Sequence, residues 1–198
     1  MLKRLLIVGV MLLAVSVIAR ADTYKIDRSH SSIGFSVRHM GLGKVKGEFR
    51  DFAGTVEYDS SDISKSKVEA IIQVPSIDTR DSSRDMHLKS SDFFAADSFP
   101  TMTFKSTKVT SKGNGKFDIT GDLTLRGVTK PVTLAAEMLG SMQDARGKRV
   151  SFEAEGKIDR MDYGVSWNRL LDTGGFVAGH DIDIQIEIEA VMRKETKP

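Results

Sequence analysis

Apolar and polar side chains alternate along several segments of this chain of 198 residues. The clearest segment is 180–190, in which isoleucines at positions 182, 184, 186 and 188 alternate with aspartate, glutamine and glutamate residues. Successive side chains of a β-strand point to opposite faces, so this period of two predicts a strand with one apolar and one polar face. A helix would scatter the same isoleucines around its circumference.

The same alternation predicts about eight strands. In chain order they cover residues 24–39 with a kink at 28–30, 45–58 with a one-residue slip near 50–51, 67–74, 101–110, 116–126, 128–139, 150–159 and 180–190. The slip is typical of a β-bulge or a sharp bend, and the Gly-Asn-Gly sequence at 113–115 is a tight-turn signal. So many one-sided strands have to bury their apolar faces together, which leaves a sandwich or a closed barrel.

Residues 81–94 depart from the alternation. The segment contains no valine, isoleucine or threonine that would favour a strand. We therefore expect a short helix here, capped by Asp81 or Ser82 and anchored in the core at its far end by Phe93 and Phe94.

The first residues do not belong to this pattern. A short basic start precedes an apolar run over residues 5–18, and Ala19-Arg20-Ala21 supplies the small-x-small sequence of a signal-peptidase site. The apolar run is too short to cross a bilayer comfortably as a helix. We therefore expect residues 1–21 to be a cleaved signal peptide and residues 22–198 to be one exported domain without stable membrane insertion.

Removal of that peptide changes the charge of the protein. The peptide carries three of the 29 basic residues and no acidic ones, so the remaining 26 basic and 27 acidic residues give a net charge of −1 in place of +2. A nucleic-acid partner is not expected, because a basic footprint is missing. The absence of cysteine excludes disulfides, thiolate metal sites and cysteine nucleophiles.

Recognisable catalytic and metal-binding motifs are missing from the sequence. It has neither a Gly-x-Ser-x-Gly elbow nor a phosphate-cradling glycine loop, and no two of its four histidines have the i, i+4 spacing of a helical metal pair. We therefore expect no metal, no cofactor and no catalytic residue. Asp85 and His87 are near enough to pair locally, and we interpret the histidines as hydrogen-bonded turn and rim residues.

Two features have open alternatives. Arg80, Arg84 and Lys89 make the helical segment basic, yet aspartates are interleaved with them. These side chains either form a solvated, internally paired surface, or one arginine faces the barrel mouth and grips a phosphate or carboxylate. The apolar alternation likewise either fills a solid core or lines a cavity, because an eight-stranded barrel is near the size at which the lumen packs shut or holds one small ligand.

Five ordered blocks resemble the YceI-like family. They are YKIDRSHSSIGFSVRHMG at 24–41, VKGEFRDF at 45–52, the pattern RDxHLxSxDFF at 84–94, FPxMxFxS at 99–106 and GDLTLRGVTK at 121–130. The resemblance implies an all-β fold, an eight-stranded antiparallel lipocalin-like barrel with a short helix inserted near the barrel mouth and a long apolar pocket inside. It also implies an association with polyisoprenoid lipids or related long-chain amphiphiles, and a periplasmic location for exported members.

We therefore expect a lipid tail in the barrel and a polar head group at its mouth. The expected apolar lumen residues are Phe35, Val37, Phe49, Phe104, Phe117, Ile119, Phe152 and Ile184. Candidates for the head group, chosen for location and chemistry, are Arg38, His39, Arg84 and His87. The expected function is a periplasmic lipid-binding carrier without catalysis, either as a monomer or as a homodimer.

Three alternatives remain open at this level. The protein could be an enzyme that acts on an amphiphile inside the barrel, with His39, Asp85 or His87 as acid–base groups. It could be an outer-membrane barrel with its apolar face toward lipid, although 7% aromatic residues supply poor aromatic girdles. It could also be a stress-response module with a filled barrel and no ligand.

Overall fold

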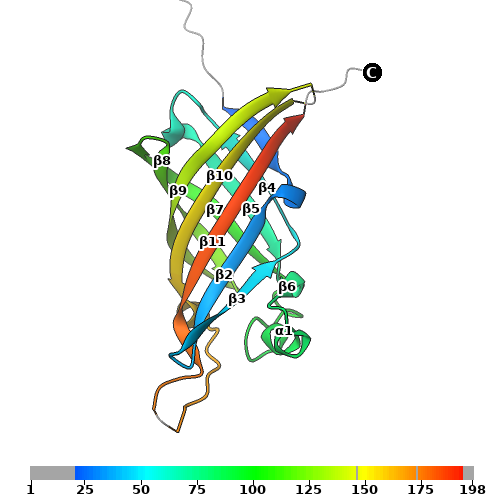
Figure 1. Ribbon diagram of the computed structural model, residues 1–198, viewed down its shortest axis with the longest axis vertical. Coiled ribbons are helices and arrows are strands. Elements are labelled where there is room, and N and C mark those ends of the chain that lie inside the picture. Colours follow the sequence, from blue (N-terminus) through cyan, green and yellow to red (C-terminus); the bar gives the residue numbers. More distant parts are fainter. Residues whose placement is uncertain (1–20, 146, 173, 194–198) are drawn as a thin grey trace, which may run out of the picture.

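The computed structural model describes residues 21–145, 147–172 and 174–193, which form one antiparallel sheet and one short α-helix (Figure 1). The predicted signal peptide lies outside the described residues, apart from Ala21. In this part of the chain, no helix has the length and apolar character that a membrane span requires.

The elements follow the predicted strands closely. The strands are β1 (Asp22–Ile26), β2 (Ser32–His39), β3 (Gly43–Phe49), β4 (Phe52–Tyr58), β5 (Lys67–Gln73), β6 (Ile77–Asp78), β7 (Thr101–Gly113), β8 (Lys116–Leu125), β9 (Val128–Asp144), β10 (Gly147–Asp159) and β11 (Ala178–Arg193). The helix is α1 (Ser82–Lys89), and the 3-10 helices are η1 (Arg28–His30), η2 (Ile63–Lys65), η3 (Val74–Ser76) and η4 (Arg160–Tyr163).

Strand pairing closes the sheet into a barrel. Its order is β1-β4-β5-β7-β8-β9-β10-β11, and β11 returns to β1 through the pairs Lys25–Val191 and Ile26–Ala190. Beyond a kink, the line of β1 continues as β2, that of β4 as β3 and that of β5 as β6. The continuing strands pair in the corresponding order, β2 with β3 and β3 with β6. Counted in this way, the described residues form an eight-stranded antiparallel barrel, which confirms the predicted fold.

Two of these kinks coincide with predicted irregularities. The kink at 28–30 is η1, whose N-cap Asp27 accepts a hydrogen bond from the backbone N–H of Ser29 at 3.2 Å. The slip near 50–51 separates β3 from β4. Phe49 and Phe52 are both buried although they are three positions apart, so the two residues between them form the bend that returns the chain to the inner face.

The helix is shorter than the predicted segment. The side chain of Asp81 caps α1 by accepting a hydrogen bond from the Arg84 backbone N–H at 3.0 Å. The helix stops at Ser90, whose hydroxyl donates to the carbonyl of His87 at 2.7 Å and so competes with the next helical turn. Residues 91–94 continue in turns and place Phe93 in the core, as expected.

The two ends of the barrel differ (Figure 1). α1, the β2–β3 turn and the β10–β11 loop lie at one end, which we call the helix end, whereas the β9–β10 turn and the ends of the described chain lie at the other, the terminus end. At the terminus end, Tyr24, Val150 and Ala190 are almost completely buried and form a small core of their own. Side chains therefore fill the barrel more fully at that end.

Candidate functional site

An apolar cavity of about 420 Å³ occupies the interior of the barrel. All eight predicted lumen residues lie on its wall, and they come from β2, β3, β7, β8, β10 and β11: Phe35, Val37, Phe49, Phe104, Phe117, Ile119, Phe152 and Ile184. The apolar face of the strands therefore points inward, opposite to the orientation that the membrane-barrel alternative requires. Contact of these side chains with a ligand stays a prediction.

Aromatic rings and glycines together keep the interior open. A Cβ atom at Gly47 would lie 2.4 Å from the ring of Phe35, and one at Gly121 would lie 2.5 Å from the ring of Phe104. Each ring therefore rests over a glycine of the neighbouring strand and lies against the wall. Inward side chains such as Ile184 remain only half-buried because they border empty space.

Arg84 brings a positive charge to the cavity wall at the helix end. Its Nε donates to the Thr79 hydroxyl at 2.8 Å, and its Nη2 donates to the Thr79 carbonyl at 2.7 Å. Among the described residues, no carboxylate forms an ion pair with this guanidinium; Asp81 caps the helix, and Asp78 pairs with Arg50 at 2.5 Å. For Arg84, the structure thus favours the interpretation of an arginine that faces the barrel mouth.

His87 also lies on the cavity wall, and its hydrogen-bond partner is Asp92, not Asp85. Its Nε2 lies 2.9 Å from the carboxylate of Asp92, whereas Asp85 accepts hydrogen bonds from the backbone N–H and hydroxyl of Thr79. The local pair of Asp85 and His87 that the sequence allows therefore does not form, whereas His87 is a hydrogen-bonded residue at the rim, as interpreted from the sequence. The helix turns the two side chains toward different neighbours, since positions two apart do not face each other.

An aromatic cluster surrounds His87. Its ring centroid lies 5.1 Å from that of Phe93 and 5.0 Å from that of Trp167, and both contacts are edge-to-face. Trp167 comes from the β10–β11 loop and also borders the cavity. Aromatic contacts of His87 with Trp167 therefore connect α1 to this loop at the mouth of the barrel.

Arg160 holds the β10–β11 loop in place. Its side chain is almost completely buried, and it donates hydrogen bonds to the carbonyls of Gly179 at 2.8 Å, of Trp167 at 3.0 Å, and of Val165. Burial lowers the pKa of this guanidinium from its ordinary value. One side chain thus joins two carbonyls of the irregular loop, those of Val165 and Trp167, to the start of β11, which positions Trp167.

Arg38 and His39 end β2 at the same opening. Both border the cavity and both are exposed. Neither has a hydrogen-bond or ion-pair partner among the side chains that the structure describes. All four predicted head-group residues therefore gather at the helix end, although their contact with a head group stays a prediction.

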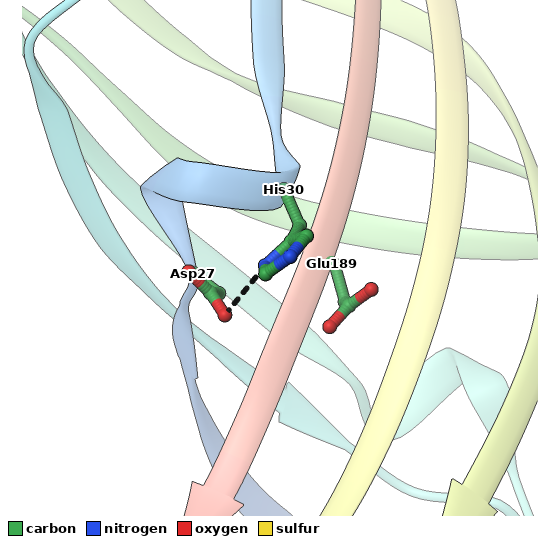
Figure 2. Close-up of side chains that lie close together, drawn as sticks. All are labelled: Asp27, His30 and Glu189. Carbon is green, nitrogen blue, oxygen red and sulfur yellow. Dashed lines mark hydrogen bonds and ion pairs between the residues drawn. The ribbon is translucent and has the colours of Figure 1, made fainter.

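A second polar cluster lies on the outside of the barrel and is shown in Figure 2. Side-chain atoms of Asp27, His30 and Glu189 lie within 4.8 Å of one another, as a metal site would require. The Nη1 of Arg149, however, lies 3.4 Å from Asp27 and contacts Glu189 as well. Because this guanidinium already forms ion pairs with both carboxylates, we interpret the cluster as an ion-pair network that connects η1 to β10 and β11.

Comparison with known proteins identifies the fold family. Residues 24–190 match the family model of the YceI-like domain. This chain belongs to the YceI-like family. It is 42% identical to protein YceI of Escherichia coli O157:H7 over 179 residues, which cover 89% of this chain and 90% of the relative. It is also 39% identical to a UPF0312 protein of Vibrio vulnificus over 186 residues, 92% of this chain and 94% of the relative.

Solved structures share the fold of this chain. A YceI protein of Campylobacter jejuni is 31% identical, with a TM-score of 0.68 over 79% of this chain and 90% of that chain. Burkholderia cenocepacia BcnA matches with a TM-score of 0.74, 23% identity and coverage of 84% and 99%. A domain from Saccharophagus degradans, described as polyisoprenoid-binding, matches with a TM-score of 0.59, 14% identity and coverage of 85% and 97%.

Two residues of the site in this YceI-like chain, Trp167 and Arg160, are not indicated by the alternation of apolar and polar positions. Trp167 lies in a loop without alternation, and Arg160 looks like any charged residue at a strand end. Their roles depend on contacts with Phe93 and with the carbonyl of Gly179, which the linear pattern does not reveal. The single tryptophan of the chain was the available hint.

Proposed function

We propose that this YceI-like protein binds a polyisoprenoid or a similar long-chain amphiphilic lipid, with the tail in the barrel and the head group at the helix end. The observation that carries the proposal is the apolar cavity with Arg84 on its wall at that end, where this guanidinium has no ion-pair partner among the residues that the structure describes. The structural neighbour described as a polyisoprenoid-binding domain supports the same class of ligand.

Burial of the tail supplies the driving force. Apolar area removed from water contributes about 25 cal/mol per Å². The wall offers almost only aliphatic and aromatic side chains for this contact. A lipid tail can therefore replace water in the cavity without leaving polar groups unpaired.

Arg84 suits an anionic head group. Thr79 already accepts hydrogen bonds from one edge of the guanidinium, so the side chain is oriented before a ligand arrives. A phosphate or carboxylate at the mouth would receive charge-assisted hydrogen bonds from the remaining donors. Arg38, His39 and His87 stand at the same opening and are the further head-group candidates.

We propose that the protein acts as a carrier in the periplasm and does not catalyse a reaction. The signal-peptide pattern of residues 1–21 supports export. Association into a homodimer stays a prediction. We expect osmotic shock to release the protein without detergent. The intact mass of the released protein should match a chain that begins at Asp22.

The enzyme alternative has weaker support. His39 and His87 border the cavity, but Asp85 is not part of its wall and its carboxylate is engaged by Thr79. Turnover of an added amphiphile that is lost in His87→Ala while binding survives would favour the enzyme. The filled-barrel alternative also has weaker support, because an apolar cavity lies inside the barrel.

Native mass spectrometry of detergent-free protein, followed by lipid extraction, tests the proposed function. We expect a bound species of lipid mass, and reloading of stripped protein with an added polyprenyl phosphate. Arg84→Gln should weaken that reloading about tenfold, because one charge-assisted hydrogen bond is worth roughly 1.5 kcal/mol. Arg80→Gln is the matched control, since Arg80 is exposed and is not on the cavity wall. Failure of stripped protein to take up any polyprenyl lipid would refute the proposal.

A further inference from the structure

Four large apolar side chains are exposed on neighbouring tips at the helix end. Leu42 is 85% exposed, Leu170 71%, Phe176 47% and Met40 41%. Met40 and Leu42 belong to the β2–β3 turn, and Leu170 and Phe176 face each other across the β10–β11 loop through an isolated β-bridge. We call these four residues the tip cluster.

The turn and the loop contact each other. The backbone N–H of Met40 donates to the carbonyl of Val177 at 2.8 Å, and His39 pairs with Ala178. Figure 1 shows both at the same end of the barrel, with the loop projecting further than the turn. These contacts join the β2–β3 turn to the end of the β10–β11 loop that precedes β11.

The tip cluster flanks the opening of the cavity. Arg38, His39, Val177 and Ala178 all border the cavity, and each lies within three residues of a member of the cluster. Anything that the tip cluster binds thus lies next to the route by which a ligand would enter. Exposed apolar side chains gathered at one opening mark an interaction site rather than ordinary surface.

The charge around the tip cluster is positive. Residues 38–46 contain Arg38, Lys44 and Lys46 and no acidic residue, while Arg169 and Asp172 balance each other in the loop. Lys44 pairs with Asp183, but Lys46 and Arg169 have no carboxylate partner among the residues the structure describes. Apolar tips beside basic residues match a bilayer surface with anionic head groups.

We propose that the tip cluster docks this protein on an anionic phospholipid bilayer, with the cavity opening toward the membrane. A protein partner fits less well, because four side chains on two narrow tips fall far short of the roughly 800 Å² that each partner buries in a standard interface. Shallow insertion of a few apolar side chains, aided by nearby cations, is enough for reversible binding to a bilayer. Docking rests on the tip cluster alone; only its use for lipid transfer depends on the proposed function.

Co-sedimentation with vesicles tests the proposal. The purified protein, with its N-terminus established by intact mass, is mixed with vesicles of phosphatidylcholine and phosphatidylglycerol or of phosphatidylcholine alone. We expect binding to the mixed vesicles that weakens with added salt. The double variant Leu42→Asp/Leu170→Asp should lower the bound-to-free ratio at least about tenfold, because it removes two apolar contacts and adds two negative charges.

The matched control is Leu139→Asp/Met142→Asp. These residues lie on β9 toward the terminus end and are 55% and 58% exposed, so they change the same chemistry away from the opening. The control should bind vesicles as the unmodified protein does. A second variant, Lys46→Gln/Arg169→Gln, should lose the preference for phosphatidylglycerol.

Each other outcome has a definite meaning. No binding of the unmodified protein, or equal loss in the tip variant and the control, would overturn the proposal. A shift from dimer to monomer in Leu42→Asp/Leu170→Asp would make the tip cluster an interface between copies of this chain, which also overturns it. Native mass spectrometry of the same samples separates the two proposals, because vesicle binding by a protein that takes up no lipid leaves docking intact and removes the carrier function.

Discussion

Single glycines shape the interior at the residue scale. Gly121 is buried on β8, and the ring of Phe104 from β7 covers it. A strand usually loses stability when it contains glycine, because glycine has the most conformational freedom to lose and no side chain to pack. Here that loss leaves space for an aromatic ring to lie along the wall, which keeps the lumen free.

Replacement of this glycine should therefore disturb both packing and cavity. In Gly121→Ala, the new Cβ would lie 2.5 Å from the Phe104 ring and 2.6 Å from the carbonyl oxygen of Lys105, so a backbone atom as well as a ring has to move. We expect the free energy of unfolding in urea to fall by about 1–3 kcal/mol. Gly140→Ala is the control, since no atom lies within 4 Å of its Cβ position. Equal stability of the two variants would contradict this account.

The inner residues of the strands could be predicted from the sequence, and the loop residues could not. Parity alone assigns Phe117 and Ile119 to the inner face, because a strand offers only two faces and one of them is polar. Arg160 reaches a carbonyl 19 positions away, and Trp167 meets a helix from another part of the chain. Such contacts depend on how the β10–β11 loop and α1 fold back onto the strands, so no local pattern contains them.

At the scale of elements, η1 shows how a kink in a strand is stabilised. Hydrogen bonds from Ser29 and His30 lower the pKa of Asp27 from 3.8 to about 2. Arg149 connects the same carboxylate to β10, and Glu189 completes the network on β11. The break between β1 and β2 is thus fastened to the strands on which the barrel closes.

This network should make stability depend on acid pH. The folded-state pKa of Asp27 lies below its ordinary value, so the ionised carboxylate stabilises the fold above about pH 4, and this contribution disappears as the pH falls through about 2. Asp27→Asn should unfold at a lower urea concentration at neutral pH. Its free energy of unfolding should be lower by on the order of 1 kcal/mol, because asparagine keeps the cap but not the charge. The difference in free energy of unfolding between Asp27→Asn and the unmodified protein should disappear as the pH approaches 2. A gap that stays constant with pH would show that the charge of Asp27 contributes nothing.

At the scale of the whole molecule, the barrel keeps a void that a better-packed core would fill. Apolar cavities of this kind leave their wall atoms without partners and reduce stability. Ala70 on β5 is one of the small residues on the wall. Its size marks a place where lumen volume has been kept at the expense of packing.

A larger side chain at this position should raise the stability of the lipid-free protein and lower its uptake of lipid. In Ala70→Phe, we expect the lipid-free protein to melt higher, by an amount equivalent to about 1 kcal/mol, because new apolar area is buried. Uptake of polyprenyl lipid should fall in native mass spectrometry. Ala135→Phe, on the exposed face of β9, should leave uptake unchanged. Unaltered uptake in Ala70→Phe would mean that the lipid does not occupy this part of the barrel.

The pairing of β1 with β11 has a consequence for how the protein is made. The first and last strands meet at Lys25–Val191, so the ring of hydrogen bonds closes only when the whole chain is present. Contacts between such distant parts of a chain form late and slowly. A nascent chain therefore cannot complete the barrel while β11 is still being synthesised, and the full set of strand pairs forms only after the end of the domain is available.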